Sequence, residues 1–189
     1  MPSLQHIRRR IYSVRNTRKI TKAMELVSGA KLRRAQVRIE QLRPYADAMA
    51  ELIGEVASRT QASRQPLLER RDVKTTAVLM MTGDRGLAGG FNSNIVKLAR
   101  QHIGKLLAAG KQVKILAVGR KGRDQLRRDY ARLIVDTIEL GGVKQVGFGL
   151  AQSIAGRVLD MYEAGEFDVA TLFYSHFKSV ISQVPTEQR

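Results

Sequence analysis

Apolar residues over the first forty-five positions recur three and four apart, which is the spacing of a coiled-coil helix. Two runs share this spacing: Leu4, Ile7, Ile11 and Val14, then Leu32, Ala35, Ile39 and Leu42. Between the runs the apolar face lies about one residue out of phase, at Ile20, Met24 and Val27. The pattern therefore predicts one long helix over residues 1–59, with an apolar stripe that changes side midway.

Two sites weaken this helical pattern. Gly29 costs about 1 kcal/mol relative to alanine inside a helix. Pro44 lacks an amide hydrogen and crowds the preceding turn, so we expect a kink or a break there. Helical spacing continues after the proline to Arg59, and the polar stretch 60–72, which contains Pro66, is predicted to be a linker.

From residue 73 the pattern changes to short apolar runs separated by amphipathic segments, which indicates an α/β domain over 73–189. The predicted strands are 75–81, 113–118, 133–138 and 168–174, and the segment 179–184 is expected either to continue the last of these or to pair with it. The predicted helices are 93–109, 120–130 and 150–162. A glycine-rich connection is expected over 141–149, and Gly119-x-x-Gly122 is expected to be a turn.

Positive charge is concentrated on the predicted long helix. Residues 1–45 hold twelve Lys or Arg and two Glu, which is +10 of the net +16 of the chain. This segment spans roughly 60 Å as a helix, whereas a compact domain built from the remaining residues is only about 35 Å across, so we expect the helix to project. Its apolar seam needs a second helix as cover, and no such helix is visible in the sequence.

The excess charge predicts an acidic partner, which is nucleic acid, an anionic membrane surface or an acidic protein surface. A helix lying on a membrane is disfavoured because Met24 and Val27 interrupt the single apolar face that such a helix needs. A nucleic-acid-binding protein with a basic helical arm stays open as an alternative. It predicts an affinity that falls steeply with salt.

The residues form no recognisable catalytic centre. The chain has no cysteine, and its three histidines, His6, His102 and His176, are dispersed, so we expect no metal site and no cofactor. The sequence predicts a chain that is not an enzyme on its own. The amino terminus lacks the apolar segment of a secretory signal and no apolar run reaches membrane-spanning length, so we expect a cytoplasmic location.

The sharpest local motif is a glycine-rich loop between a predicted strand and a predicted helix, Thr82-Gly83-Asp84-Arg85-Gly86-Leu87-Ala88-Gly89-Gly90-Phe91-Asn92. Backbone amides of such a loop can bind phosphate, which would suit a nucleotide-binding enzyme. The spacing matches neither a P-loop nor a dinucleotide fingerprint. We therefore favour a tight turn in which the glycines take positive φ and Asp84 pairs locally with Arg85.

Four motifs, in order along the chain, resemble the gamma subunit of F-type ATP synthases. They are Ile20-Thr21-Lys22-Ala23-Met24-Glu25-Leu26-Val27-Ser28-Gly29-Ala30-Lys31, Arg43-Pro44-Tyr45, the segment from Asp84 to Asn92, and Ser182-Gln183-Val184-Pro185. The resemblance covers the whole chain, and its first and third motifs are highly specific to that family.

The resemblance implies a rotor shaft, in which the N-terminal helix is half of an antiparallel coiled coil attached to a small Rossmann-like α/β domain. The implied function is to couple proton translocation through the c-ring to conformational cycling of the catalytic beta subunits, for ATP synthesis or hydrolysis. The implied partners are the alpha and beta subunits, the epsilon subunit and the c-ring, without nucleic acid. The implied location is the cytoplasmic face of the bacterial cell membrane, with membrane association only indirect, through Fo.

The resemblance also implies subunit contacts. A carboxylate-rich lever of the beta subunit is expected to meet Thr21, Lys22, Ala23 and Met24, and to be approached from below by Asp84, Arg85, Gly86, Leu87, Gly89 and Gly90. Two features depart from the family. Ala88 stands where many members have cysteine, and the chain stops at Arg189, before the C-terminal helix that completes the shaft.

Overall fold

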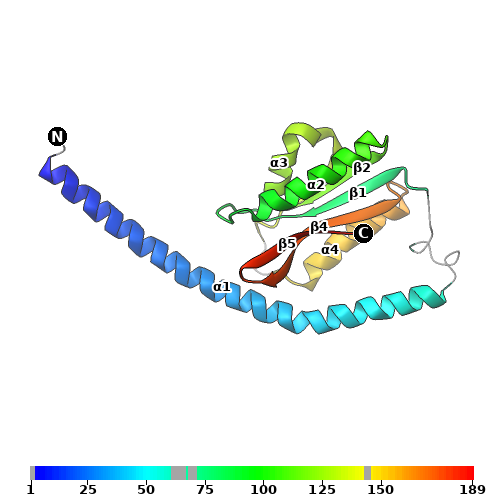
Figure 1. Cartoon of the computed structure of the whole chain (residues 1–189), viewed down its shortest axis with the longest axis horizontal. Coiled ribbons are helices and arrows are strands. Elements are labelled where there is room, and N and C mark those ends of the chain that lie inside the picture. The colour runs from blue at the N-terminus through cyan, green and yellow to red at the C-terminus, as the bar shows by residue number, and fades with distance from the viewer. Residues whose placement is uncertain (1–2, 61–66, 68–71, 143–145) are drawn as a thin grey trace. The chain divides into compact units, whose positions relative to one another are not determined.

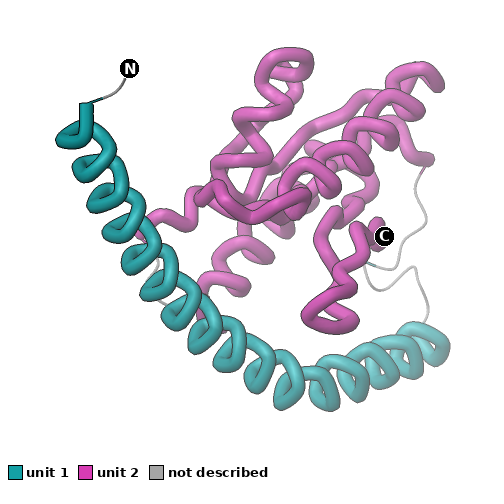
Figure 2. The backbone as a smooth tube through the Cα atoms, turned by 60° about the vertical axis from the view of Figure 1, so that its left-hand side comes forward, with its two compact units in different colours: residues 1–70 teal, residues 71–189 magenta. Residues whose placement is uncertain are grey.

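The chain forms two compact units, residues 1–70 and 71–189 (Figure 2). The computed structural model describes residues 3–60, 67, 72–142 and 146–189. Most of the predicted linker 60–72 lies outside the described residues, as does the middle of the predicted glycine-rich connection 141–149.

The first unit is one helix, α1, which runs from Leu4 to Arg59 over 56 residues, or roughly 84 Å. The side chain of Ser3 caps it by accepting a hydrogen bond from the His6 amide at 3.3 Å. Pro44 lies inside the helix and does not end it, so of the predicted kink or break the break is absent. Figure 1 shows instead that the helix changes direction gradually where its colour passes from light blue to cyan.

None of the described side chains of α1 is buried. Leu4, Ile7, Ile11 and Val14 are 65%, 45%, 49% and 62% exposed, and Leu32 is 39% exposed, as the periodicity predicted for a seam without cover in this chain. Ile39 is half-buried rather than fully exposed. A helix of this length with no buried face is unusual in a stable domain, because most helical stability comes from packing an apolar face.

The second unit is built on a five-stranded sheet in the order β3-β2-β1-β4-β5. Its strands are β1 (Thr75–Met81), β2 (Gln112–Val118), β3 (Ile134–Ile138), β4 (Val169–Ser179) and β5 (Ser182–Gln188). The first four are parallel and β5 is antiparallel to β4. All five predicted strands exist; β1 has the predicted bounds, and the other four differ from their predicted bounds by one to five residues. Leu133 belongs to a 3-10 turn, Ala131–Leu133, and β4 extends to Ser179 because its second half pairs with β5.

Three helices cover the sheet, α2 and α3 on one face and α4 on the other (Figure 1). They are α2 (Phe91–Ala108), α3 (Arg120–Tyr130) and α4 (Phe148–Glu163). The helix pattern predicted each of them, but α4 starts inside the segment that was predicted to be a connection. Gly122 lies within α3, so the turn predicted at Gly119-x-x-Gly122 is wrong for its second glycine.

Strand alternation places the core on both faces of the sheet. Val78 and Met80 of β1 are fully buried in the cluster that includes α2 and Leu126 of α3, while Ala77 belongs to a smaller cluster with Met161 of α4. The predicted fold class, a long N-terminal helix with a Rossmann-like α/β domain, is confirmed. The topology places the loop that follows β1 next to the loop that follows β2, at the carboxyl end of the sheet.

Candidate interaction surfaces

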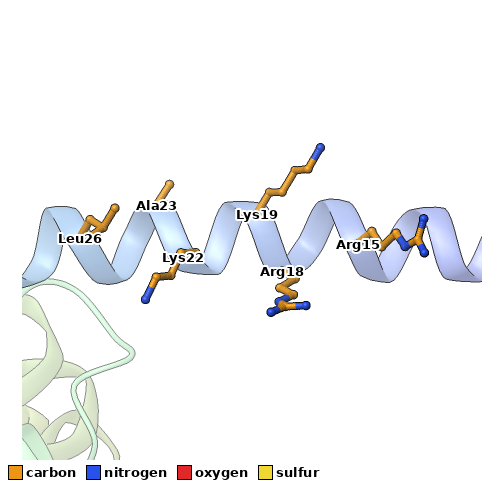
Figure 3. Close-up of a pocket in the computed structure, with 6 residues that line it drawn as sticks. All are labelled: Arg15, Arg18, Lys19, Lys22, Ala23 and Leu26. Carbon is orange, nitrogen blue, oxygen red and sulfur yellow. The ribbon is translucent and has the colours of Figure 1, made fainter.

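The first predicted contact segment, residues 21–24, lies on α1 in a stretch rich in cations. A shallow hollow on this stretch is lined by Arg15, Arg18, Lys19, Lys22, Ala23 and Leu26. Figure 3 shows Arg18 and Lys22 pointing to one side of the helix, and Lys19, Ala23 and Leu26 pointing to the other. These six residues are spaced three and four apart, so one broad face of the helix presents the cations beside Ala23 and Leu26.

The charges on this segment are almost all free to meet a partner. Lys22 contacts Glu25 at 3.1 Å, but both side chains are about two-thirds exposed, 64% and 69%. Exposed pairs of this kind contribute only about 0–1 kcal/mol. Within the described part of the chain, no other Lys or Arg from Arg8 to Arg38 lies within salt-bridge distance of a carboxylate.

The four residues of the predicted Thr21–Met24 contact differ in what they can offer. The Thr21 hydroxyl donates to the backbone carbonyls of Thr17 at 3.1 Å and Arg18 at 3.0 Å, so it is committed to the helix itself. Lys22, Ala23 and Met24 are exposed, and Met24 keeps 53% of its surface. The segment thus offers one cation, Lys22, and one flexible apolar side chain, Met24, on different sides of the helix.

The second predicted contact segment, the glycine loop of residues 83–90, begins at a tightly packed junction. Thr82 is buried, and its hydroxyl lies 3.0 Å from the Val118 carbonyl and 3.1 Å from the Gly119 carbonyl. Gly119 has φ +92°, and a Cβ there would lie 2.1 Å from the Thr82 carbonyl oxygen. Only glycine therefore fits where the β2–α3 turn passes this strand end.

The sequence predicted a local pair between Asp84 and Arg85, and this prediction is wrong. Its Oδ1 atom accepts a hydrogen bond from the backbone amide of Arg120 at 2.7 Å, at the first turn of α3. No ion pair joins Asp84 to Arg85 among the described residues. The carboxylate occupies the place that an anion would take at the start of α3.

The middle of the loop is exposed and partly in left-handed conformation. Leu87 has φ 58° and is 100% exposed, and Gly89 has φ +53°. Gly90 precedes the first residue of α2, and a Cβ there would lie 3.0 Å from Asn94 Nδ2. The predicted tight turn with positive-φ glycine is confirmed at Gly89, whereas the positive φ of Leu87 was not foreseen.

Sequence reasoning missed the residues that hold the loop in place. Asn92 is 8% exposed, and its Oδ1 atom accepts a hydrogen bond from the Gly83 amide at 2.9 Å. The Gly122 amide donates a second hydrogen bond, to the Thr82 hydroxyl, at the same end of the sheet. These partners lie nine to forty residues apart, and only the Gly119-x-x-Gly122 spacing hinted at a close approach.

The described residues contain no group of three His, Cys, Asp or Glu side chains that could hold a metal ion. None of the helices described here is both long and apolar enough to span a bilayer.

Comparisons with known proteins agree along the whole chain. The sequence model of a family described as ATP synthase matches residues 3–189. The chain is 56% identical to the ATP synthase gamma chain of Chelativorans sp. (strain BNC1) and 53% identical to that of Paracoccus denitrificans (strain Pd 1222). Both alignments cover 100% of the present chain. It spans 66%, about two thirds, of the length of both relatives.

Solved structures give the same result at lower identity. The central stalk and c-ring of the Tetrahymena thermophila mitochondrial ATP synthase includes a chain that is 29% identical, with a TM-score of 0.71 over 89% of this chain and 70% of that chain. A rotor chain of the Euglena gracilis mitochondrial ATP synthase is 19% identical, with a TM-score of 0.64 over 96% of this chain and 60% of that chain, and supports the fold alone.

Proposed function

The chain belongs to the family of ATP synthase gamma chains, and we propose that it acts in the central-stalk rotor of such an enzyme. In this role it couples proton translocation through a c-ring to the conformational cycle of catalytic beta subunits. The chain itself carries no catalysis. Its work is mechanical, because a rotating asymmetric helix changes the contacts offered to each surrounding subunit in turn.

The observation that carries this proposal is the unburied α1 helix. It presents an apolar seam and a dense set of unpaired cations, and no described residue of α1 is buried. A seam of this kind is stabilised by a second helix, and the cations suit a carboxylate-rich surface. Both are features of a shaft enclosed by other subunits.

The proposed partners follow from the same surfaces. Alpha and beta subunits would surround α1, with Lys22 and Met24 against an acidic lever of a beta subunit. The α/β unit would contact an epsilon subunit and the c-ring, and its glycine loop of residues 83–90 would approach a beta subunit. The chain would then be a peripheral membrane protein on the cytoplasmic face of a bacterial membrane. The nucleic-acid-binding alternative has no support in the comparisons reported above.

Binding to the proposed partners can be tested directly. The complete chain is used to pull down the alpha and beta subunits of the same organism, with double-stranded DNA added as competitor. We expect retention of both subunits at DNA concentrations that saturate non-specific binding. Loss of the subunits to DNA, with an affinity that falls steeply as salt rises, would favour the nucleic-acid alternative.

The coupling role predicts a specific effect of Lys22→Glu. The substitution replaces an exposed cation, so the free energy of unfolding should change by no more than about 0.5 kcal/mol. Opposite an acidic lever it turns attraction into repulsion, and ATP-driven proton pumping by the reconstituted complex should fall. Lys105→Glu, an exposed charge reversal on α2, is the matched control. Unchanged pumping in Lys22→Glu would contradict the proposed contact.

A further inference from the structure

The three residues that follow β1 accept hydrogen bonds from the first three amides of α3, in reverse order. Asp84 Oδ1 accepts from the Arg120 amide at 2.7 Å. The Gly83 carbonyl accepts from the next amide, that of Lys121, at 3.1 Å, and Thr82 Oγ1 accepts from the third at 3.0 Å. Three of the four amides that a helix start leaves without an internal partner are therefore satisfied by one short segment.

The α3 helix depends on this segment because it has no cap of its own. Its N-cap residue is Gly119, which has no side chain, and its first turn contains no acidic residue. Asp84 supplies both the acceptor and the negative charge that a helix start favours. The other carboxylate oxygen, Oδ2, faces Gly141, where a Cβ would lie only 3.3 Å away.

The loop is also tied at its far end, which leaves only its middle free. The Gly83 amide donates to Asn92 Oδ1 at 2.9 Å, and the Phe91 amide donates to the Ala88 carbonyl at 3.1 Å. Between these ties Arg85 and Leu87 are exposed. Among the described residues Arg85 has no charged partner, and Leu87 is held at φ 58° with its whole side chain in solvent.

We infer that Asp84 is a positioning residue, whose carboxylate caps α3 and thereby fixes the direction in which the glycine loop presents Arg85 and Leu87 to a partner subunit. The inference rests on the proposed function for the identity of that partner. It divides the loop into an anchoring residue and two contact residues, which fit a partner surface with a carboxylate beside an apolar side chain. Asp84 itself makes no contact across the interface.

Four variants of the complete chain separate these roles. Asp84→Ala removes the cap, whereas Asp84→Asn keeps an oxygen that can accept from the Arg120 amide. Arg85→Ala removes a contact without touching the cap. Glu163→Ala removes an exposed carboxylate of α4 and serves as the matched control.

The first measurement is hydrogen exchange at the Arg120 and Lys121 amides, which does not depend on any partner. We expect exchange to rise about tenfold in Asp84→Ala, the size of a typical capping loss, and to stay at the wild-type rate in the other three variants. Wild-type exchange in Asp84→Ala would overturn the inference, whatever the function of the chain.

The second measurement is the affinity of each variant for the assembled alpha and beta subunits. A loop that spends less time in the competent direction binds more weakly by the same factor, so we expect Asp84→Ala to lose about tenfold. Arg85→Ala should also bind more weakly, while Asp84→Asn and Glu163→Ala should bind as the wild type does. An Asp84→Asn variant that binds as weakly as Asp84→Ala, while its Arg120 amide exchanges at the wild-type rate, would show that the charge acts across the interface, and would overturn the inference. If the wild-type chain itself does not bind, the proposed function fails, and the exchange result still decides whether Asp84 caps α3.

Discussion

Replacing Gly122 with alanine should push α3 away from the sheet. A Cβ at this position would lie 2.5 Å from Met80 Cε, 2.6 Å from Thr82 Oγ1 and 2.9 Å from Thr82 Cγ2. Met80 is fully buried, and both close atoms of Thr82 belong to one branched side chain, so neither neighbour can withdraw freely. The helix must therefore retreat, and the 3.0 Å hydrogen bond between the Gly122 amide and Thr82 lengthens.

The magnitude follows from three opposing effects. Overpacking in a buried contact costs about 1–3 kcal/mol, and weakening of the buried hydrogen bond adds about 1 kcal/mol. Replacing glycine by alanine inside a helix contributes about 1 kcal/mol of stability in return. We expect Gly122→Ala to lower the free energy of unfolding of the α/β unit by about 2 kcal/mol.

Gly104→Ala provides the matched control with the opposite sign. Gly104 also lies inside a helix, α2, but a Cβ there meets nothing within 4 Å. Only the gain in helix propensity remains, so the free energy of unfolding should rise by up to about 1 kcal/mol. The same chemical change should therefore differ by about 3 kcal/mol between the two helices, and that difference comes from the distances at the Thr82 junction.

The assay must report on the α/β unit alone, because a long separate helix would dominate a helical circular dichroism signal. Urea titration of the whole chain meets this need when unfolding is monitored by hydrogen exchange of the β2 amides. Equal effects of Gly122→Ala and Gly104→Ala would refute the close approach of α3 to the sheet. A stabilised Gly122→Ala variant would refute it more directly.

Two further changes test α1. Pro44→Ala restores an amide donor to the helix, so exchange of the amides around residues 40–48 should slow, with up to about 3 kcal/mol of added helix stability, and unchanged exchange there would show that the proline costs α1 nothing. Ile11→Asp should barely alter the stability of the isolated chain, since Ile11 is 49% exposed, but should weaken binding of a covering helix by several kcal/mol. The control Tyr12→Asp, next to the seam, should bind that helix more nearly as the wild type does, and equal binding by the wild type and both variants would argue against the seam.

Local pattern predicted the elements of this fold because each carries its own period. The run Thr75–Met81 was predicted as a strand and is β1 with the same bounds, since buried parallel strands are continuous apolar runs. The three-and-four spacing of Leu4 to Val14 was sufficient to predict α1. The same reasoning predicted a kink or a break at Pro44, and the break is absent because a proline inside a long helix can be accommodated by bending.

The contacts of the glycine loop could not be predicted in this way. Asp84 and Arg120 are 36 residues apart, and their hydrogen bond exists because parallel strands bring the loops after β1 and β2 to one edge of the sheet. The local pattern of the sequence predicted a pair between Asp84 and its neighbour Arg85 because the strand order was not known from that pattern. Strand order had to be known before the carboxylate could be assigned to α3.

The exposed seam of α1 also explains how the helix can tolerate Gly29 and Pro44, two residues that weaken a helix. Gly29 and Pro44 together cost a helix about 4 kcal/mol, and no burial within α1 offsets that cost. Six large apolar side chains of the two seam runs are exposed, namely Leu4, Ile7, Ile11, Val14, Leu32 and Leu42. Since each is already partly covered by its own helix, burying the rest contributes about 1 kcal/mol per side chain, or about 6 kcal/mol before the entropy of association. That gain exceeds the cost of the glycine and the proline, so a partner helix can stabilise α1 even though its sequence includes residues that an isolated helix would avoid.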